Sequence, residues 1–248
     1  MILPSTWSTR PAPPLADGDV HVWRMRLSGD WGAKAPAVLS ASEQERASRY
    51  LSDVHRRAYI LTRMHVRAIL GQYLDVAANE ISFGAGRHGK PYLHRDEGDH
   101  PVRFNLSHSG DLALLAVSRE REVGVDLERW RENVAFGELA TRFFSSSEHS
   151  ALHQLTHDTD ALLEAFYTVW ARKEAYIKAT GDGITRGLST FDVSHDTHGT
   201  PLFVRDRRDP SATTRWTMMT LSVAPGYSAA LVVAAPIGAV TLIDAVEP

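Results

Sequence analysis

The chain has 248 residues, 43% of them hydrophobic and 23% charged, and its formal net charge at pH 7 is -3. These values are ordinary for a soluble globular protein of one large or two small domains, and they exclude a general attraction to nucleic acid or an anionic membrane. The absence of cysteine excludes disulfides, thiolate metal sites and a cysteine nucleophile.

The N-terminal stretch MILPSTWSTRPAPPLADG is too polar and too rich in proline to be a signal peptide. No segment approaches the roughly eighteen unbroken apolar residues of a membrane span. The apolar run 228–240 is short and interrupted by Pro236, so it is interpreted as a buried strand. A cytoplasmic location is therefore expected.

The first half of the chain predicts a strand, two helices and a hairpin, in that order. Segment 19–27, DVHVWRMRL, alternates apolar and polar residues as a half-buried strand does. Ser42 and Glu45 spell an S-x-x-E capping box that predicts the start of a helix, and a longer helix is expected over 53–71. Segment 102–118 then forms two strand-like runs around a glycine turn.

The second half repeats this order. Segment 122–130 is the strand, and Ser145 with Glu148 forms another S-x-x-E box. A long helix is expected from about residue 160 to a glycine C-cap at residue 181. A second hairpin, over 216–235, completes the series.

Matching positions in the two halves are separated by a constant number of residues. Val20 and Val123 lie 103 apart (123−20), as do the two capping serines (145−42). The pattern predicts an α+β fold of two similar lobes, 1–120 and 121–248, related by a pseudo-twofold axis with a cleft between them. The same order of elements also arises without duplication, so that alternative stays open.

The strand VGVDLERW, residues 123–130, carries two carboxylates on one face. Asp126 and Glu128 are two residues apart and so point the same way, opposite the apolar face. Two carboxylates this close repel each other and need a counter-charge if they are buried. The alternative is an edge strand with a solvated polar face.

The second long helix contains a row of residues spaced by four, which therefore share one face. Phe166 and Trp170 are expected to be buried, and the row ends in a carboxylate and an amine: Leu162, Phe166, Trp170, Glu174 and Lys178. Glu174 and Lys178 could equally be a surface ion pair. Together with the two strand carboxylates, however, they offer three oxygen ligands suited to Mg²⁺ and a lysine suited to phosphate.

Positive and polar groups in the first half could hold a second anionic part of a ligand. Lys90 precedes Pro91, which fixes an extended or turn conformation, and Ser107 and His108 precede the glycine turn. The candidate cations are Arg46, Arg56, Arg57, Lys90 and His108. Taken alone, each of these residues is equally well explained as a solvated group on the surface.

In these motifs and several others, the sequence resembles the 4′-phosphopantetheinyl transferases of the broad-specificity type, which serve peptide and polyketide synthetases. The matching stretches, over roughly residues 20–235, are HGKPY, FNLSHSG, VGVDLERW, RFFSSSEHSAL and FYTVWARKEAYIKATGDGI. The pair of motifs G-x-D-x-E and W-x-x-K-E-A-x-x-K carries most of the specificity.

The resemblance implies an enzyme of the holo-[acyl-carrier-protein] synthase type with a two-lobe fold. Such an enzyme binds coenzyme A and Mg²⁺ in the cleft and transfers phosphopantetheine to a serine of an apo acyl or peptidyl carrier protein. It releases adenosine 3′,5′-bisphosphate. A monomer acting in secondary metabolism, with no nucleic-acid or membrane partner, is expected.

The resemblance also implies roles for individual residues. Asp126, Glu128 and Glu174 would ligate Mg²⁺; Glu174 would in addition be the base for the incoming serine, directly or through water. Lys178 would hold the pyrophosphate. The remaining coenzyme A contacts would come from Arg46, Arg56, Arg57 and His108 at the 3′-phosphate, from Lys90 and Pro91 at the adenine, and from Ser107. Glu148 would support the site by pairing with Lys173.

Some members of the family carry a basic residue where Glu43 or Ala58 stands here, so the resemblance leaves open which arginine reaches the 3′-phosphate. Apolar residues that contact the carrier are expected near the cleft mouth, between Arg87 and Asp99.

Two other functions fit the same residues: a Mg²⁺-dependent hydrolase of nucleotide pyrophosphates, and a carrier-binding module without chemistry. The intact set of acidic residues argues against the second.

Three further patterns are set aside. The G-x-G-x-x-G run at 84–89 is followed by Pro91, which breaks the helix that a dinucleotide site requires. His149, His153 and His157 are spaced for a zinc site on a helix, but their polar neighbours favour a solvated face. The charged run at 205–210 is expected to be a solvated loop.

Overall fold

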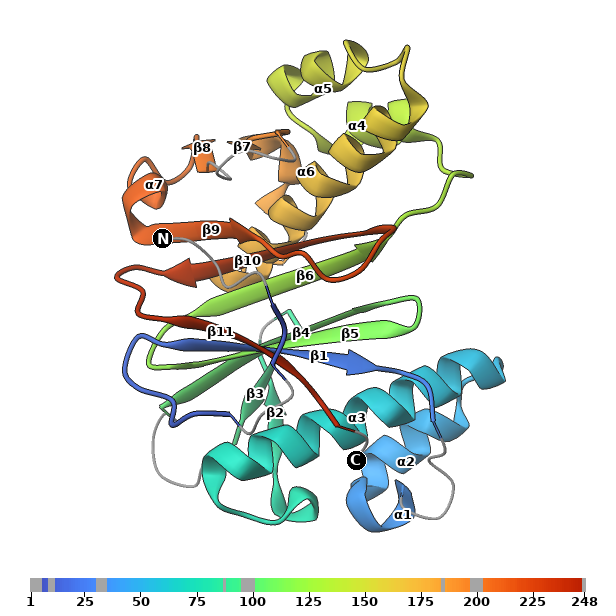
Figure 1. The fold of residues 1–248 in the computed structure, drawn as a ribbon, viewed down its shortest axis with the longest axis vertical. Helices are drawn as coiled ribbons and strands as arrows, with labels where there is room; N and C mark the ends of the chain where they lie inside the picture. Colours follow the sequence, from blue (N-terminus) through green and yellow to red (C-terminus); the bar gives the residue numbers. More distant parts are fainter. Residues whose placement is uncertain are drawn as a thin grey trace.

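The structure, a computed structural model, describes residues 6–8, 12–29, 35–86, 88–94, 101–183, 186–196 and 203–246. Two β-sheets form its centre, and helices cover them from opposite sides (Figure 1). This is the mixed α+β architecture that the sequence predicts.

The first sheet has the strand order β11-β1-β5-β4, with β11 parallel to β1 and the other pairs antiparallel. The second sheet has the order β6-β10-β9 and is antiparallel. Their strands are β1 (Val20–Arg26), β4 (Val102–Ser109), β5 (Leu112–Arg119), β6 (Val123–Arg129), β9 (Trp216–Thr220), β10 (Tyr227–Ala234) and β11 (Val240–Asp244).

One long helix covers each sheet: α3 (Asp53–Leu74) lies on the first and α6 (Thr159–Thr180) on the second (Figure 1). The shorter helices are α1 (Ala35–Val38), α2 (Ala41–Ser48), α4 (Phe136–Phe143), α5 (Ser146–His153) and α7 (Ala212–Arg215), with 3-10 turns η1 (Ala78–Glu80) and η3 (Leu188–Thr190). Two small hairpins pair β2 (Phe83–Ala85) with β3 (Pro91–Leu93) and β7 (Phe191–Val193) with β8 (Phe203–Asp206).

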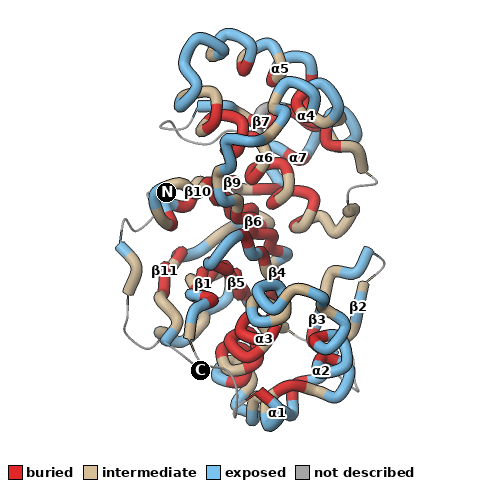
Figure 2. The backbone as a smooth tube through the Cα atoms, turned by 90° about the vertical axis from the view of Figure 1, so that its right-hand side faces the viewer, coloured by how far each residue is buried: buried red, intermediate tan, exposed pale blue. Residues whose placement is uncertain are grey.

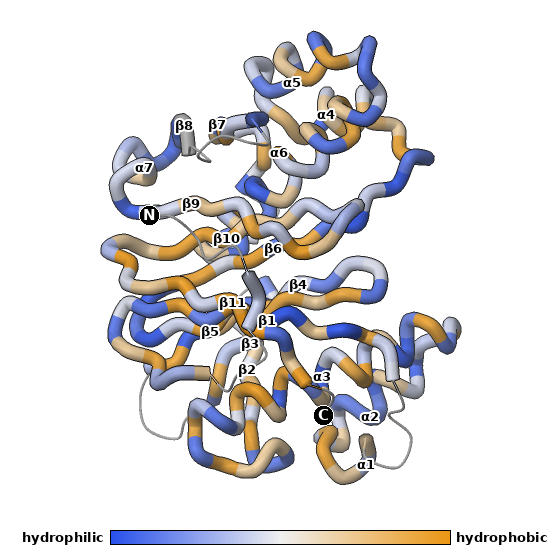
Figure 3. Tube along the Cα trace, viewed as in Figure 1, coloured by the Kyte–Doolittle hydropathy of each residue, from blue (hydrophilic) through white to orange (hydrophobic). Residues whose placement is uncertain are grey.

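Three apolar layers hold this arrangement together. One lies between α3 and the first sheet, a second between the two sheets, and a third between α6 and the second sheet. The strands at the centre are accordingly largely buried (Figure 2), and hydrophobic residues recur along them (Figure 3). No helix in the described part of the chain is both long and apolar enough to span a membrane.

Most elements lie where the sequence predicts them, and the first capping box is the main correction. The helix α2 is capped by Ser40, whose hydroxyl accepts a hydrogen bond from the N–H of Glu43, and not by Ser42 with Glu45. The reason is tertiary: Glu43 is also bound by Arg67 of α3, which fixes where the helix begins. The predicted box of Ser145 and Glu148 is confirmed at α5.

Further side-chain expectations are corrected. Trp170 is only half-buried, although its ring packs on Phe143, Phe144 and Phe166. The run 205–210 is not a solvated loop throughout, since Asp206 ends β8, is buried, and accepts a hydrogen bond from Tyr176 at 2.7 Å.

In the described part of the chain, the glycine run and the histidine series both lack the structure that a ligand site would require. The first glycine of the run, Gly84, lies in β2, and Pro91 after the run begins β3, so a strand and not a helix follows, as expected. His149 and His153 lie on α5, which ends at His153, so His157 is not on the same helix.

The last strand crosses back to the first sheet. β11 pairs in parallel with β1 over five residues, from Val240 opposite Val20 to Asp244 opposite Arg24. The boundary predicted at residues 120 and 121 therefore leaves one strand of the C-terminal segment in the sheet of the N-terminal segment.

Candidate active site

The strand β6 lies between two chemically different surroundings, and its alternation separates them. Val123, Val125 and Leu127 are buried between the two sheets. The other face turns to α6, where a Cβ at Gly124 would overlap the carbonyl oxygen of Ala175 and the backbone of Ala179. The glycine thus permits the close contact that brings α6 against the carboxylate face of β6.

Asp126 is buried and lies beside Lys178 of α6. The Lys178 Nζ is 2.6 Å from Asp126 Oδ1, and the Ser107 hydroxyl donates to the same oxygen at 2.8 Å. Asp126 Oδ2 is also buried but has no hydrogen-bond partner among the described residues. A buried carboxylate oxygen without a partner is costly in a folded protein, so this atom calls for a ligand.

The other two carboxylates are electrostatically coupled to Asp126. Burial and the nearby Asp126 raise the pKa of Glu128 to about 7. The same two causes raise the pKa of Glu174 to about 7, against the opposing effect of Lys178. The structure therefore brings the predicted strand carboxylates and the predicted helix pair into one acidic site.

The donor chemistry of this site fits a hard divalent cation. Three carboxylates, one with an unpartnered buried oxygen, supply the oxygen ligands that Mg²⁺ prefers. Among the described residues, however, no three acidic or histidine side chains are already arranged as a metal site. Lys178 pairs with one oxygen of Asp126 and so supplies one positive charge to the acidic site.

A pocket of about 180 Å³ lies beside this site. It is formed by the β2–β3 hairpin, by β4, and by the C-terminal end of α6. Its lining residues are Gly86, His88, Lys90, Pro91, Tyr92, Leu93, Val102, Arg103, Phe104, Glu122 and Gly181. Lys90 is held there by Glu122, at 3.4 Å, and by the carbonyl oxygen of Val123, at 3.2 Å.

Ser107 and His108, further along β4, lie next to Lys178 of the acidic site. Ser107 accepts a hydrogen bond from Lys178 Nζ at 3.0 Å. The His108 side chain is accessible, yet partial desolvation, Lys178 and His55 all lower its pKa. This coupling places His108 close to Lys178 and the N-terminal end of α3.

The predicted arginines lie further out. Arg46 stacks over Tyr59 at 5.4 Å, Arg56 pairs with Asp53, and Arg57 donates to the carbonyl of Gly29. Within the described part of the chain, no hydrogen bond, ion pair or cation–π contact joins these three arginines to the acidic site or the pocket. Their proposed role at a phosphate stays a prediction.

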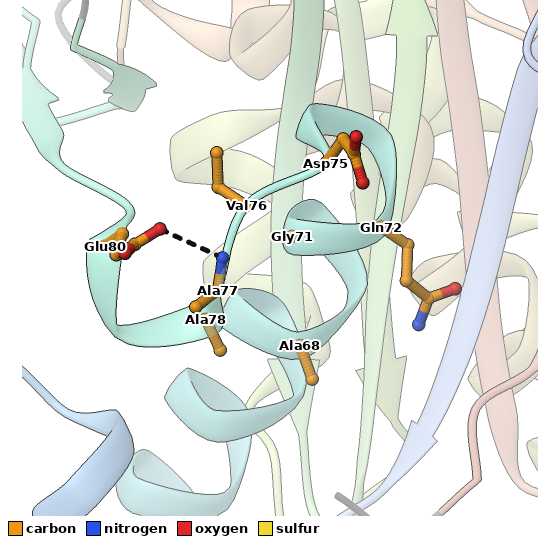
Figure 4. A pocket seen from close by; sticks show the side chains of 8 residues that line it. All are labelled: Ala68, Gly71, Gln72, Asp75, Val76, Ala77, Ala78 and Glu80. Carbon is orange, nitrogen blue, oxygen red and sulfur yellow. Dashed lines mark hydrogen bonds between the residues drawn. The ribbon is translucent and has the colours of Figure 1, made fainter.

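The larger described pocket, of about 500 Å³, is not this site. It is a shallow depression at the C-terminal end of α3 and in the turn after it (Figure 4). Its lining includes the carboxylates Asp75 and Glu80 but no basic side chain, so it lacks the charge that a phosphate ligand needs.

Several residues of the site are not apparent from sequence motifs. Arg103, Glu122 and His88 line the pocket, and Ser109 donates to Glu128 at 3.2 Å. The alternating polar residues of FNLSHS are the signal that could identify Ser109, since they share one face of β4. The expected carrier-contact segment from Arg87 to Asp99 is described only over 88–94, where Tyr92 is exposed.

The expected pairing of Glu148 is confirmed. Lys173 is completely buried, and its Nζ lies 2.8 Å from Glu148 Oε2 and donates to the carbonyl oxygens of Leu188 and Phe191. This pair ties α5 and the β7 region to the turn of α6 that carries Glu174.

Comparison with known proteins gives matches over nearly the whole chain. The profile of the 4′-phosphopantetheinyl transferase superfamily matches residues 122–232, and that of the 4′-phosphopantetheinyl transferase N-terminal region matches 26–120. The 4′-phosphopantetheinyl transferase HetI of Nostoc sp. is 38% identical over 190 residues, 75% of this chain and 78% of the relative. The 4′-phosphopantetheinyl transferase Sfp of Bacillus subtilis is 30% identical over 213 residues, 85% and 88% of the two chains.

Proposed function

This chain belongs to the 4′-phosphopantetheinyl transferase superfamily, and from that premise we propose how its own residues perform the reaction. The enzyme transfers the 4′-phosphopantetheine group of coenzyme A to a serine of an apo carrier protein and releases adenosine 3′,5′-bisphosphate. Acyl and peptidyl carriers are its proposed substrates, and Mg²⁺ is its proposed metal.

The observation that carries the metal site is the unpartnered, buried Oδ2 of Asp126. It lies in a site where Glu128 and Glu174 also have raised pKa values because of burial and of Asp126. A divalent cation bound by Asp126, Glu128 and Glu174 would satisfy the oxygen and offset the repulsion. When bound, Mg²⁺ would supply positive charge that stabilises the diphosphate and the negative charge that develops on the leaving bisphosphate.

The chain's own residues account for the remaining steps. The serine oxygen of the carrier attacks the phosphorus that bears pantetheine; a new P–O bond forms and the bond to the other phosphate breaks. Lys178 adds positive charge at the diphosphate. Glu174 accepts the serine proton, directly or through water, as a carboxylate general base within hydrogen-bond reach can do.

The pocket beside the acidic site is the proposed binding site of the nucleotide. Lys90 and Pro91 line it, as the resemblance implies for the residues beside the adenine. Ser107 and His108 lie close to Lys178, which suits contacts with phosphates. Arg46, Arg56 or Arg57 would complete the 3′-phosphate site from α2 and α3.

The two lobes, 1–120 and 121–248, are proposed to be pseudo-twofold copies. In support, α3 and α6 both have 22 residues and both end in a left-handed C-cap. Each is preceded by a capping-box helix whose glutamate is bound by a basic residue of the long helix: Glu43 by Arg67, and Glu148 by Lys173. The monomeric state and the cytoplasmic location stay predictions.

The proposed function is tested by incubating the protein with coenzyme A, Mg²⁺ and an apo carrier protein. The carrier should gain the mass of one phosphopantetheine group, while a carrier whose acceptor serine is replaced by alanine, or a reaction with EDTA, should give none. Release of adenosine bisphosphate without modification of the carrier would instead favour the hydrolase. Carrier binding without either product would favour a binding module. A panel of fatty-acid, polyketide and peptide carriers then defines the substrate.

A further inference from the structure

The two sheets meet along β4 and β6, where side chains take the place of a backbone ladder. Within the described part of the chain, β4 is an edge of the first sheet and β6 an edge of the second. The backbone N–H groups of Val125, Leu127 and Arg129 point away from β10 towards β4. Such groups at the edge of a sheet need partners.

Three alternate residues of β4 supply these partners. Asn105 Oδ1 accepts from the N–H of Val125 at 2.8 Å, Ser107 Oγ from that of Leu127 at 3.3 Å, and Ser109 Oγ from that of Arg129 at 3.0 Å. All three side chains are buried. The register between the two sheets is therefore fixed by a row of side-chain acceptors.

The two serines of this row also reach the carboxylates that alternate with these N–H groups. Ser107 donates to Asp126 Oδ1 at 2.8 Å, and Ser109 donates to Glu128 Oε2 at 3.2 Å. A hydroxyl has one hydrogen to donate. Because the backbone N–H fills an acceptor position of Ser109, its single hydrogen is directed to Glu128.

We infer that Ser109 is a positioning residue, whose hydroxyl holds the Glu128 carboxylate by one oxygen in the orientation that binds the divalent cation. The inference rests on the proposed function, in which Glu128 is a metal ligand. Outer hydrogen bonds to metal ligands fix their orientation, and their loss typically costs about 10–100-fold in metal affinity. In this inference Ser109 acts only through Glu128, whereas Ser107 is proposed to contact coenzyme A itself.

The test measures binding of Mn²⁺, as a spectroscopic substitute for Mg²⁺, to the full-length protein with and without coenzyme A. Free Mn²⁺ is quantified by electron paramagnetic resonance. Ser109→Ala should raise the Kd for Mn²⁺ by about 10-fold or more and raise the Mg²⁺ concentration needed for half-maximal transfer. The kcat at saturating Mg²⁺ and the affinity for coenzyme A in EDTA should change little, which a general loss of structure would not produce.

Two variants serve as controls. Ser109→Thr retains the hydroxyl and should restore the Kd to within a few-fold of the original. Ser118→Ala removes a buried serine of the neighbouring strand β5, whose hydroxyl donates to the carbonyl oxygen of Arg121, and should leave the Kd unchanged. Should Ser109→Ala fail to fold, Ser109→Cys keeps the volume with a much weaker donor and should show the same loss.

Glu128→Ala separates this inference from the proposed function. If Glu128→Ala abolishes Mn²⁺ binding while Ser109→Ala leaves the Kd unchanged, the positioning role is wrong and the metal site stands. If Glu128→Ala itself leaves binding unchanged, the metal assignment of Glu128 fails and the role of Ser109 fails with it.

Discussion

At the scale of the residue, the site depends on carboxylates held where water does not fully solvate them. Asp126 is buried beside Lys178, while Glu128 and Glu174 have pKa values raised to about 7 by burial and by Asp126. Without a divalent cation, Glu128 and Glu174 resist ionisation because each is buried near Asp126. This makes the metal-free site a place where charge, protonation and metal binding are coupled.

Replacing Asp126 with Asn tests the central ligand. Asp126→Asn keeps the shape of the side chain but removes the charge that pairs with Lys178. Transfer to the carrier should fall by at least about 100-fold, since changes around metal ligands already cost 10–100-fold. The measurement is kcat together with Mn²⁺ binding, with circular dichroism as the control of folding. Near-normal turnover would overturn the metal assignment.

The raised pKa of Glu174 predicts how stability depends on pH in EDTA. Its pKa is about 7 in the folded protein against an ordinary value of 4.5. Between these pH values the folded protein retains a proton that the unfolded chain has released, so the free energy of unfolding should fall as pH rises from about 4.5 to 7 and level off above. The loss from this group is on the order of 1–3 kcal/mol.

Glu174→Gln removes this titration. The free energy of unfolding of the variant, measured by urea denaturation across the same range, should therefore decrease less with rising pH than that of the original protein. Parallel curves for the two proteins would show that Glu174 does not have a raised pKa.

At the scale of the element, the distance between β6 and α6 decides whether the carboxylates and Lys178 meet. Gly124 lets the backbone of α6 lie directly on the strand, next to Ala175 and Ala179. The buried Glu148–Lys173 pair holds the same part of α6 from its other side. The glycine of the G-x-D-x-E motif thus has a packing role, because it allows the helix that carries Glu174 and Lys178 to lie close to the strand that carries Asp126.

Gly124→Ala should separate these elements. The added Cβ would overlap the carbonyl oxygen of Ala175, a backbone atom that cannot move without shifting α6. We expect destabilisation of about 3 kcal/mol and a loss of Mn²⁺ affinity, measured by urea denaturation and by electron paramagnetic resonance.

The matched control is Gly137→Ala in α4, where an added Cβ meets nothing within 4 Å. It should change stability by less than about 1 kcal/mol, in the stabilising direction. Equal effects of the two substitutions would show that the contact at Gly124 is not close.

At the scale of the whole molecule, the chain closes on itself through β11. This strand pairs with β1, and its Leu242 belongs to the apolar layer between the two sheets. The N-terminal sheet is therefore completed by residues from the far end of the chain. Neither predicted lobe is expected to be an independent folding unit.

A chain that ends after Ala239 tests this closure. Loss of β11 exposes one side of β1 and part of the layer between the sheets, so the Tm should fall by more than about 10 °C, as expected from the loss of several buried side chains. A chain that ends after Val246 retains every described residue and is the control. An unchanged Tm on removal of β11 would show that the two segments fold independently.

The local pattern of the sequence determined most of the elements and the identity of the acidic residues. Alternation along 123–130 separated the buried face from the carboxylate face, and the spacing of four placed Glu174 and Lys178 on one row of α6. Glycine and S-x-x-E signals marked the helix ends at Gly181 and Ser145. These features depend on interactions within a few residues, which a sequence displays directly.

Only the tertiary structure decided which groups meet. It selected Ser40 in place of Ser42 as the cap of α2, because Arg67 binds Glu43 from another helix. It joined β11 to β1 and placed Ser109 against Glu128. These contacts link residues far apart in the chain, and their free energy depends on packing and burial, which local spacing does not encode.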